Sequence, residues 1–178
     1  MKYAALLRGI NVGGKNKVAM ADLRSVVEAC GYTGVKTYIN SGNVVFDAAK
    51  ADDRKIAGKI HDQLLEDLGL DISVMVRSVA EIEAIIAKNP YSGQFENHKD
   101  LHVFFLADEL SNENSALLLE KNSDAEMISV DGRTIYYLLR ISIVDSVLGK
   151  GFIDRKLKVP ATARNWRTVE KLAELGNG

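Results

Sequence analysis

The sequence predicts an α+β fold that consists of two ferredoxin-like halves and a C-terminal helix. Three observations support this prediction. The first 78 residues alternate apolar patterns in the order strand, helix, strand, strand, helix, strand. The second half restarts that order near residue 100. Each half places a turn-rich hairpin after its first helix, "NSGN" in one and Asp131-Gly132 in the other.

The first half contains five segments in sequence. Residues 3–9, "YAALLRG", form a short apolar run stopped by glycine, which is typical of a strand. Residues 20–31 place apolar side chains at helical spacing before a glycine. Residues 35–48 predict two strands around "NSGN". Residues 53–69 predict a helix from apolar positions four apart, and the alternation in residues 71–78 predicts a strand.

The next four segments lead into the second half. Residues 78–90 predict a helix with a serine cap that ends before Pro90. Residues 100–108 predict a strand, and residues 111–122 predict a helix capped by its first serine. Residues 125–140 predict a hairpin, since Asp-Gly is a strong two-residue turn signal.

The end of the chain completes a second, shorter copy. Residues 142–151 predict a helix, and a final helix is expected to begin near Thr162. The second copy is therefore βαββα, without the last strand of the first copy. We expect a first subdomain over residues 1–78 and a second over residues 79–178 with a helical tail, or one compact domain that includes both. Residues 89–100 are the best candidate for the join.

Charge is distributed unevenly along the chain. The net charge is -1, which gives no overall attraction to nucleic acid or membrane. Residues 1–17 carry four basic side chains and no acidic one, and residues 150–178 carry seven basic and three acidic. The middle is correspondingly acidic. The two basic ends form one patch if the fold brings them together, and otherwise remain two solvated clusters.

The composition indicates a soluble globular protein in a reducing compartment. Apolar residues make up 47 % of the chain and charged residues 26 %. The single cysteine, Cys30, excludes an internal disulfide and is expected to be an inert, buried thiol. Neither a leader peptide nor a membrane-spanning run is apparent. We therefore expect a cytoplasmic protein with no membrane partner.

The first candidate site is the loop "RGINVGGKNKV", residues 8–18. Gly9 to Lys15 matches the body of a phosphate-binding P-loop, but the next residue is asparagine and the predicted sheet is not parallel. A weaker interpretation survives, in which backbone N–H groups and lysines of this loop bind an anion. The alternative is a glycine-bearing connection with solubilising lysines. The candidate ligand-binding residues are Arg8, Asn11, Gly13, Gly14, Lys15 and Lys17.

The second candidate is the hairpin "TYINSGNVVF", residues 37–46. Turn chemistry alone explains Gly42 and the asparagines, because glycine adopts a positive φ and asparagine forms local hydrogen bonds. It does not explain the cluster of hydroxyl groups beside them. Tyr38, Ser41 and Asn43 are therefore candidate binding residues, although the structural explanation is favoured.

The third candidate is "TARNWRTV", residues 162–169. On a helix that begins near Thr162, Trp166 belongs to the apolar face and is expected to anchor the core. Thr162 is a plausible N-cap. Arg164 is unfavourable at a helix N-terminus unless an anion or an acidic side chain lies nearby. Thr162, Arg164 and Asn165 are therefore candidate ligand-binding residues, with a structural ion pair as the commoner alternative.

Other chemistry finds little support in the sequence. The three histidines are too scattered for a metal site, and no cofactor motif is present, so we expect neither. Ser41 lacks the surroundings of a nucleophile elbow. "HVFFLAD" lacks the aromatic order of an RNA-recognition strand.

The motifs "LLRGINVGG", "TYINSGNVVF" and "TARNWRTV" together resemble the bacterial family known as domain of unknown function 1697. The resemblance extends over nearly the whole chain and implies an α+β fold of duplicated ferredoxin-like parts. It implies no activity. It places Gly42 and Trp166, with most of the candidate residues above, in the family's signature blocks. The hairpin block departs from the family pattern at one position, because this chain has Asn40 where the family pattern has glutamine.

Three hypotheses about function follow. The first is a binding module for a phosphate-bearing ligand, either a nucleotide or nucleic acid, at one site built from the three motifs. The second is an enzyme that acts on a small phosphorylated or carboxylated metabolite, with Tyr38 or Lys15 as the proton-transfer group. In the third, the motifs are turns and caps, and the protein binds a protein partner. We favour the first hypothesis slightly.

Overall fold

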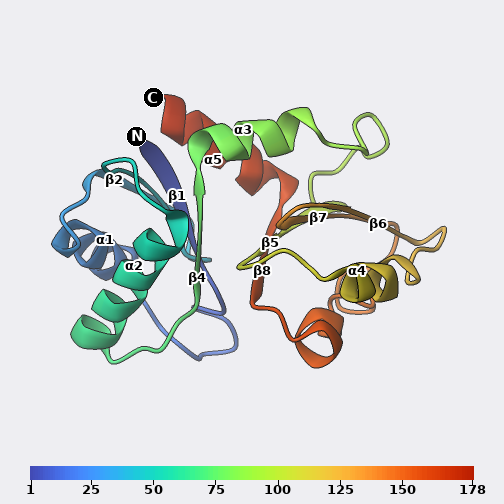
Figure 1. Cartoon of the computed structure of the whole chain (residues 1–178), viewed down its shortest axis with the longest axis horizontal. Helices are drawn as coiled ribbons and strands as arrows, with labels where there is room; N and C mark the ends of the chain where they lie inside the picture. The colour runs from blue at the N-terminus through green and yellow to red at the C-terminus, as the bar shows by residue number, and fades with distance from the viewer. The chain divides into compact units, whose positions relative to one another are not determined.

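The computed structural model describes residues 1–178, which divide into two compact units. The first unit comprises residues 1–84 and 171–178, and the second comprises residues 85–170. Each unit contains one four-stranded antiparallel sheet (Figure 1). The predicted α+β fold with duplicated ferredoxin-like halves is confirmed. The predicted boundary after residue 78 stays a prediction.

The two sheets have the same strand order. The first has the order β2-β3-β1-β4 and the second β6-β7-β5-β8. In both, the first strand of the unit pairs with its third and its last strand, as the ferredoxin-like topology requires. The bounds are β1 (Lys2–Leu7), β2 (Thr33–Tyr38), β3 (Asn43–Asp47), β4 (Val74–Ser78), β5 (Leu101–Leu106), β6 (Glu126–Asp131), β7 (Thr134–Leu139) and β8 (Ala161–Asn165).

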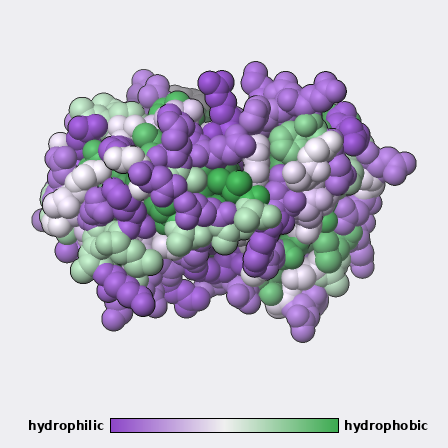
Figure 2. All heavy atoms as spheres, turned by 90° about the horizontal axis from the view of Figure 1, so that it is seen from above, coloured by the Kyte–Doolittle hydropathy of each residue, from purple (hydrophilic) through white to green (hydrophobic).

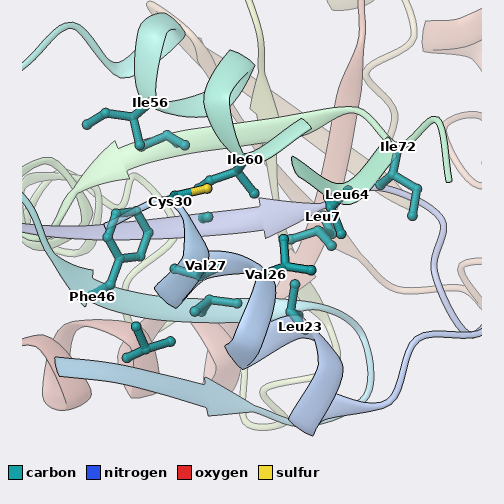
Figure 3. Close-up of a cluster of buried hydrophobic side chains, with 14 of the residues drawn as sticks. Leu7, Leu23, Val26, Val27, Cys30, Phe46, Ile56, Ile60, Leu64 and Ile72 are labelled. Atoms are coloured by element: carbon teal, nitrogen blue, oxygen red, sulfur yellow. The ribbon is translucent and has the colours of Figure 1, made fainter. Parts of the chain in front are cut away.

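The core of the first unit lies between its sheet and two helices, α1 (Met20–Ala29) and α2 (Asp53–Leu68). Apolar side chains at helical spacing form one stripe on each helix, and both stripes face the sheet (Figure 3). Burial of each large aliphatic side chain contributes about 1.5–3 kcal/mol. Cys30 belongs to this core, and burial raises the pKa of its thiol, in keeping with an inert structural role.

Side chains cap the helices of the first unit at α2 and α3 but not at α1. Asp52 accepts a hydrogen bond from the Arg54 N–H at 2.8 Å, which caps α2. α3 (Val79–Ala87) opens with a capping box, in which Ser78 and Glu81 each accept a backbone N–H of the other. By contrast, Ala19 stands at the N-cap of α1 and offers no side-chain acceptor.

The predicted helix over residues 142–151 is wrong. α4 (Asn112–Leu119) follows β5 as predicted, with Ser111 as its cap, but turns occupy residues 143–151 and lead to a short π-helix, η1 (Ile153–Leu157). The hydroxyl of Ser146 donates to the Ile143 carbonyl at 2.7 Å and accepts from the Gly149 N–H at 3.0 Å. These side-chain bonds compete with helical backbone bonds.

The second copy has its last strand, contrary to the sequence prediction. Residues 161–165 form β8, which pairs with β5, and the final helix α5 (Trp166–Asn177) begins four residues later than expected. "ATARN" has weak strand propensity, since alanine and asparagine are depleted in strands. Pairing with the buried strand β5 outweighs that local preference.

Stability is expected to fall on acidification because of His102 on β5. Its Nδ1 atom is buried without a hydrogen-bond partner, and burial lowers its pKa below the ordinary value of 6.5, although Asp100 opposes the shift. The unfolded chain therefore binds a proton that the folded chain resists. Stability should decrease as pH falls through 6.5 toward the lower folded pKa. Urea unfolding of wild type and His102→Gln across this range measures the effect, which the variant should lack.

His61 provides a control with the opposite sign. Its ring bonds to Asp71 at 2.9 Å and to Asp62 at 3.1 Å, and these bonds raise its pKa above 6.5. Its contribution is complete below that value and is lost as pH rises through the folded pKa. His61→Gln should therefore steepen the acid loss slightly. If His102→Gln kept the wild-type pH profile, the assignment to His102 would be wrong.

Candidate functional site

The loop of residues 8–18 folds into a miniature hairpin. The Asn11 N–H donates to the Asn16 carbonyl, and the Lys15 N–H donates to the Val12 carbonyl, both at 3.1 Å. Gly13 and Gly14, the two central residues of the tight turn, have φ values of +57° and +76°. Glycine adopts this left-handed pair without steric cost, which explains the Gly-Gly sequence.

Asn11 joins this loop to the hairpin between β2 and β3. Its Nδ2 donates to the Val18 carbonyl at 2.9 Å and to the Asn40 carbonyl at 2.8 Å. Its Oδ1 accepts from the Val18 N–H at 2.9 Å. The first two sequence motifs therefore lie side by side. The Asn11 amide is occupied by this framework and is not left to bind a ligand.

The hairpin turn is held in the same way. The side chain of Asn43 is fully buried, and its Nδ2 donates to the Tyr38 carbonyl and to the Ser41 hydroxyl, each at 2.9 Å. The Leu7 N–H donates to the Gly42 carbonyl at 2.9 Å, which joins the turn to β1. Ile39 has a φ of +48°, a costly conformation for a β-branched residue.

A cavity of about 420 Å³ lies between the loop and the turn, lined by Asn11, Gly14, Lys17, Val18, Ala19 and Asn40. α1 begins at its edge, and the first turn of that helix has no side-chain cap. Helix N-terminal amides attract anions because of their free N–H groups and the helix dipole. Lys15 and Lys17 are exposed and form no ion pair. The cavity thus combines backbone donors with positive charge.

The other predicted residues of the first unit are not among those that line the cavity. Arg8 is half-buried, and its N–H donates to the Ser73 carbonyl at 3.0 Å. Gly13 and Lys15 belong to the tight turn. Tyr38 and Ser41 are half-buried in the hairpin. Among the candidate residues, the cavity lining includes Asn11, Gly14 and Lys17.

The third motif belongs to the second unit and does not form the predicted helix terminus. Thr162 lies in β8 and is not an N-cap. Arg164 is also a strand residue, only 6 % exposed, and its Nη1 donates to the Thr162 hydroxyl and the Ala163 carbonyl, both at 2.8 Å. Burial lowers the pKa of Arg164 to about 10. Arg164 lies in a strand and not in the first turn of a helix, so its charge does not conflict with a helix dipole and requires no bound anion.

Asn165 is the residue that caps α5, and it accepts hydrogen bonds from the N–H and the hydroxyl of Thr168 at 3.0 and 2.9 Å. One of the first-turn amides predicted to bind an anion, that of Thr168, is thus taken by a side chain, and the anion site there stays a prediction. Trp166 is buried, and its ring meets Phe95 edge-on with centroids 6.2 Å apart. It is the core anchor that the sequence predicts.

A repeat that the sequence analysis missed links β4 and β8. Each strand ends with a buried arginine followed by a helix cap, Arg77-Ser78 in one and Arg164-Asn165 in the other. Arg77 donates to the Val76 carbonyl at 2.8 Å, as Arg164 does to the carbonyl before it. Comparison of "VRSVAE" with "ARNWRT" would have identified β8 as the counterpart of β4.

Val18 and Asn40 lie inside the candidate segments but were not named as binding residues, and Ala19 lies outside them. An available signal was the alanine immediately before "MADLRSVV". Serine, threonine, aspartate and asparagine are strongly preferred at the N-cap, so an alanine there indicates a helix terminus without a side-chain cap.

No helix of the chain combines the length and apolar character needed to cross a bilayer. No group of three or more histidine, cysteine, aspartate and glutamate side chains is placed to hold a metal ion.

Comparison with known proteins identifies a family and a fold. None of the curated proteins matches the chain. The chain is similar to the conserved bacterial protein SP0830 from Streptococcus pneumoniae, with 26 % identity, a TM-score of 0.77, and coverage of 98 % of this chain and 97 % of that chain. The profile of a family described as "protein of unknown function (DUF1697)" matches residues 1–136. The chain therefore belongs to the DUF1697 family.

Proposed function

We propose that this protein binds a phosphate-bearing ligand of the nucleotide class in the cavity beside Lys17. One observation supports this most strongly: a cavity of about 420 Å³ meets the uncapped N-terminus of α1 and a lysine without an ion-pair partner. Carboxylates are absent from the residues that line it. Such an arrangement favours an anion through hydrogen bonds, the helix dipole and a full charge.

Two exposed apolar side chains favour a nucleotide over inorganic phosphate. Val12 and Ile39 are 67 % and 49 % exposed, and each is the chain neighbour of one partner in the Asn11–Asn40 hydrogen bond. The left-handed φ of Ile39 costs about 1–2 kcal/mol. Residues held in such strained conformations are concentrated at active sites and ligand-binding sites. A nucleobase supplies the apolar face that these side chains would contact.

Binding is better supported than catalysis. Lys17 is the one titratable residue that lines the cavity. Neither Tyr38 nor Lys15, the proton-transfer groups of the enzyme hypothesis, lines it. The proposed site does not include Thr162, Arg164 and Asn165. These residues belong to the second unit, and their side chains form hydrogen bonds within it. We propose a cytoplasmic location, where nucleotides are available to such a site.

Lys17→Ala is expected to weaken binding of AMP about tenfold, because one charge-assisted hydrogen bond is lost. Isothermal titration with AMP, ribose 5-phosphate, adenosine and inorganic phosphate measures this. AMP should bind more tightly than ribose 5-phosphate, and adenosine should bind most weakly of the nucleotide parts. Failure of every phosphate-bearing compound to bind would refute the proposal.

Lys55→Ala is the matched control, since Lys55 is an exposed lysine on α2 outside the cavity. It should leave AMP affinity unchanged. A short single-stranded oligonucleotide distinguishes nucleic acid from mononucleotide. Its affinity should fall steeply with salt if several phosphates bind, whereas one phosphate gives a shallow dependence.

A further inference from the structure

We propose a second small-molecule site, in the second unit, that binds a free α-amino acid with an apolar side chain. The site is a cavity of about 330 Å³. It is lined by residues 93–96, by Asp100, and by the end of β7 with Arg140. Its size is at the lower end of the range for ligand sites in proteins.

The cavity contains charges of both signs that do not neutralise each other. Arg140 supplies a guanidinium, and Glu96 and Asp100 supply carboxylates. None of the three forms an ion pair, whereas other residues of this unit do, such as Lys88 with Asp131 at 2.9 Å. Opposite charges around one cavity that remain unpaired are available to a ligand with both charges.

Backbone hydrogen bonds hold the segments that carry Asp100 and Arg140 side by side. The Leu139 N–H donates to the Asp100 carbonyl at 2.7 Å, and the Arg140 N–H donates to the Ala125 carbonyl at 2.9 Å. The Asp100 N–H donates to the Asn97 carbonyl at 2.9 Å, which closes the loop. The part of the site that carries Asp100 and Arg140 is therefore held by paired backbone before a ligand binds.

The lining residues match the parts of an amino acid. The planar guanidinium of Arg140 suits a carboxylate, which it binds with two parallel hydrogen bonds. The carboxylates of Glu96 and Asp100 suit an ammonium group. Phe95 is half-buried, and its ring packs edge-on against Trp166, so its remaining surface provides an apolar wall.

Isothermal titration of the full chain with L-leucine tests the site against its two halves, 4-methylpentanoate and isopentylamine. Leucine should bind about tenfold more tightly than either, because each half loses one charge-assisted interaction. Arg140→Ala should weaken leucine about tenfold and leave isopentylamine unchanged. Asp100→Asn should weaken leucine and isopentylamine and leave 4-methylpentanoate unchanged.

Two controls separate this inference from the nucleotide site. Arg24→Ala removes an exposed arginine of α1, outside the cavity, and should leave leucine affinity unchanged. Lys17→Ala should also have no effect on leucine. Absence of leucine binding, equal affinity for isopentylamine, or an unaltered affinity in Arg140→Ala would overturn the inference.

Discussion

Replacement of Gly42 by alanine is expected to lower the free energy of unfolding by about 3 kcal/mol. Gly42 has a φ of +80°, which an L-residue adopts at a cost. A methyl group there would lie 2.8 Å from the Cβ of Leu7 and 2.7 Å from the Cδ1 of Ile10. The Ile10 terminus can rotate away, but the Leu7 Cβ is fixed to β1. Urea unfolding of both proteins measures the loss.

Gly69→Ala is the matched control for backbone strain alone. Gly69 has a similar φ of +67°, at the C-terminus of α2, and a methyl group there would meet nothing within 4 Å. Its cost is therefore the conformational part, about 1 kcal/mol. Equal losses in the two variants would show that the close approach to β1 contributes nothing.

The same substitution connects the fold to the proposed site. The Gly42 carbonyl accepts a hydrogen bond from the Leu7 N–H, and two residues earlier Asn40 forms part of the cavity wall. A displaced turn would move Asn40 away from Asn11. Gly42→Ala should thus also weaken AMP binding, while Gly69→Ala should not.

Periodic local patterns predicted most elements of the fold correctly. The four-residue spacing of α2 reflects burial on one face, which a single segment displays by itself. The alternation in residues 71–78 marked β4 correctly, although that strand is buried on both faces. The Asp131-Gly132 hairpin was equally clear, because a tight turn requires particular residues. The polar positions between the apolar ones lie on the surface. Figure 2 shows one face of the molecule, on which hydrophilic side chains predominate and hydrophobic ones form small groups.

The errors in the fold occur where long-range contacts decide the conformation. β8 has little strand propensity and exists because β5 offers it a partner. Residues 143–151 have apolar spacing that suits a helix, but Ser146 bonds to the backbone in place of helical contacts. Neither outcome can be read from the local sequence.

The site was predicted in part for a related reason. Loops rich in glycine and asparagine marked the correct region, because such residues hold tight backbone geometry. Whether an amide side chain faces a ligand or its own backbone depends on tertiary contacts. The side chains of Asn11 and Asn43 bond to backbone groups of the protein itself, whereas Ala19, the N-cap residue of α1, lines the cavity.

Tyr137→Phe is expected to lower the free energy of unfolding by about 2–3 kcal/mol, because hydrogen bonds to buried charged groups are the strong ones. The Tyr137 hydroxyl donates to the carboxylate of Glu126, which is 8 % exposed, and the Val147 N–H donates to the same oxygen at 2.9 Å. The Leu148 N–H donates to the Tyr137 oxygen at 3.4 Å. This network fastens the turns of residues 143–151 to β6 and β7.

Tyr136→Phe supplies the comparison, since the Tyr136 hydroxyl donates to a neutral acceptor, the Ile85 carbonyl, at 2.9 Å. Its loss should be about 1 kcal/mol. Equal losses in urea unfolding would show that the carboxylate of Glu126 adds nothing to the bond.

Alkaline unfolding gives a second readout of the Tyr137 network. Burial first, and then the bond to Glu126, raises the pKa of Tyr137 from 10.0 to about 12. The folded chain thus retains a proton that the unfolded chain releases, so this contribution is complete below pH 10 and is lost as pH rises toward 12. Tyr137→Phe lacks the group and should lose less stability than wild type over that interval. A parallel decline in the two proteins would place the titrating group elsewhere. A shallower decline in the variant would show that the phenol proton itself holds the irregular segment to the sheet.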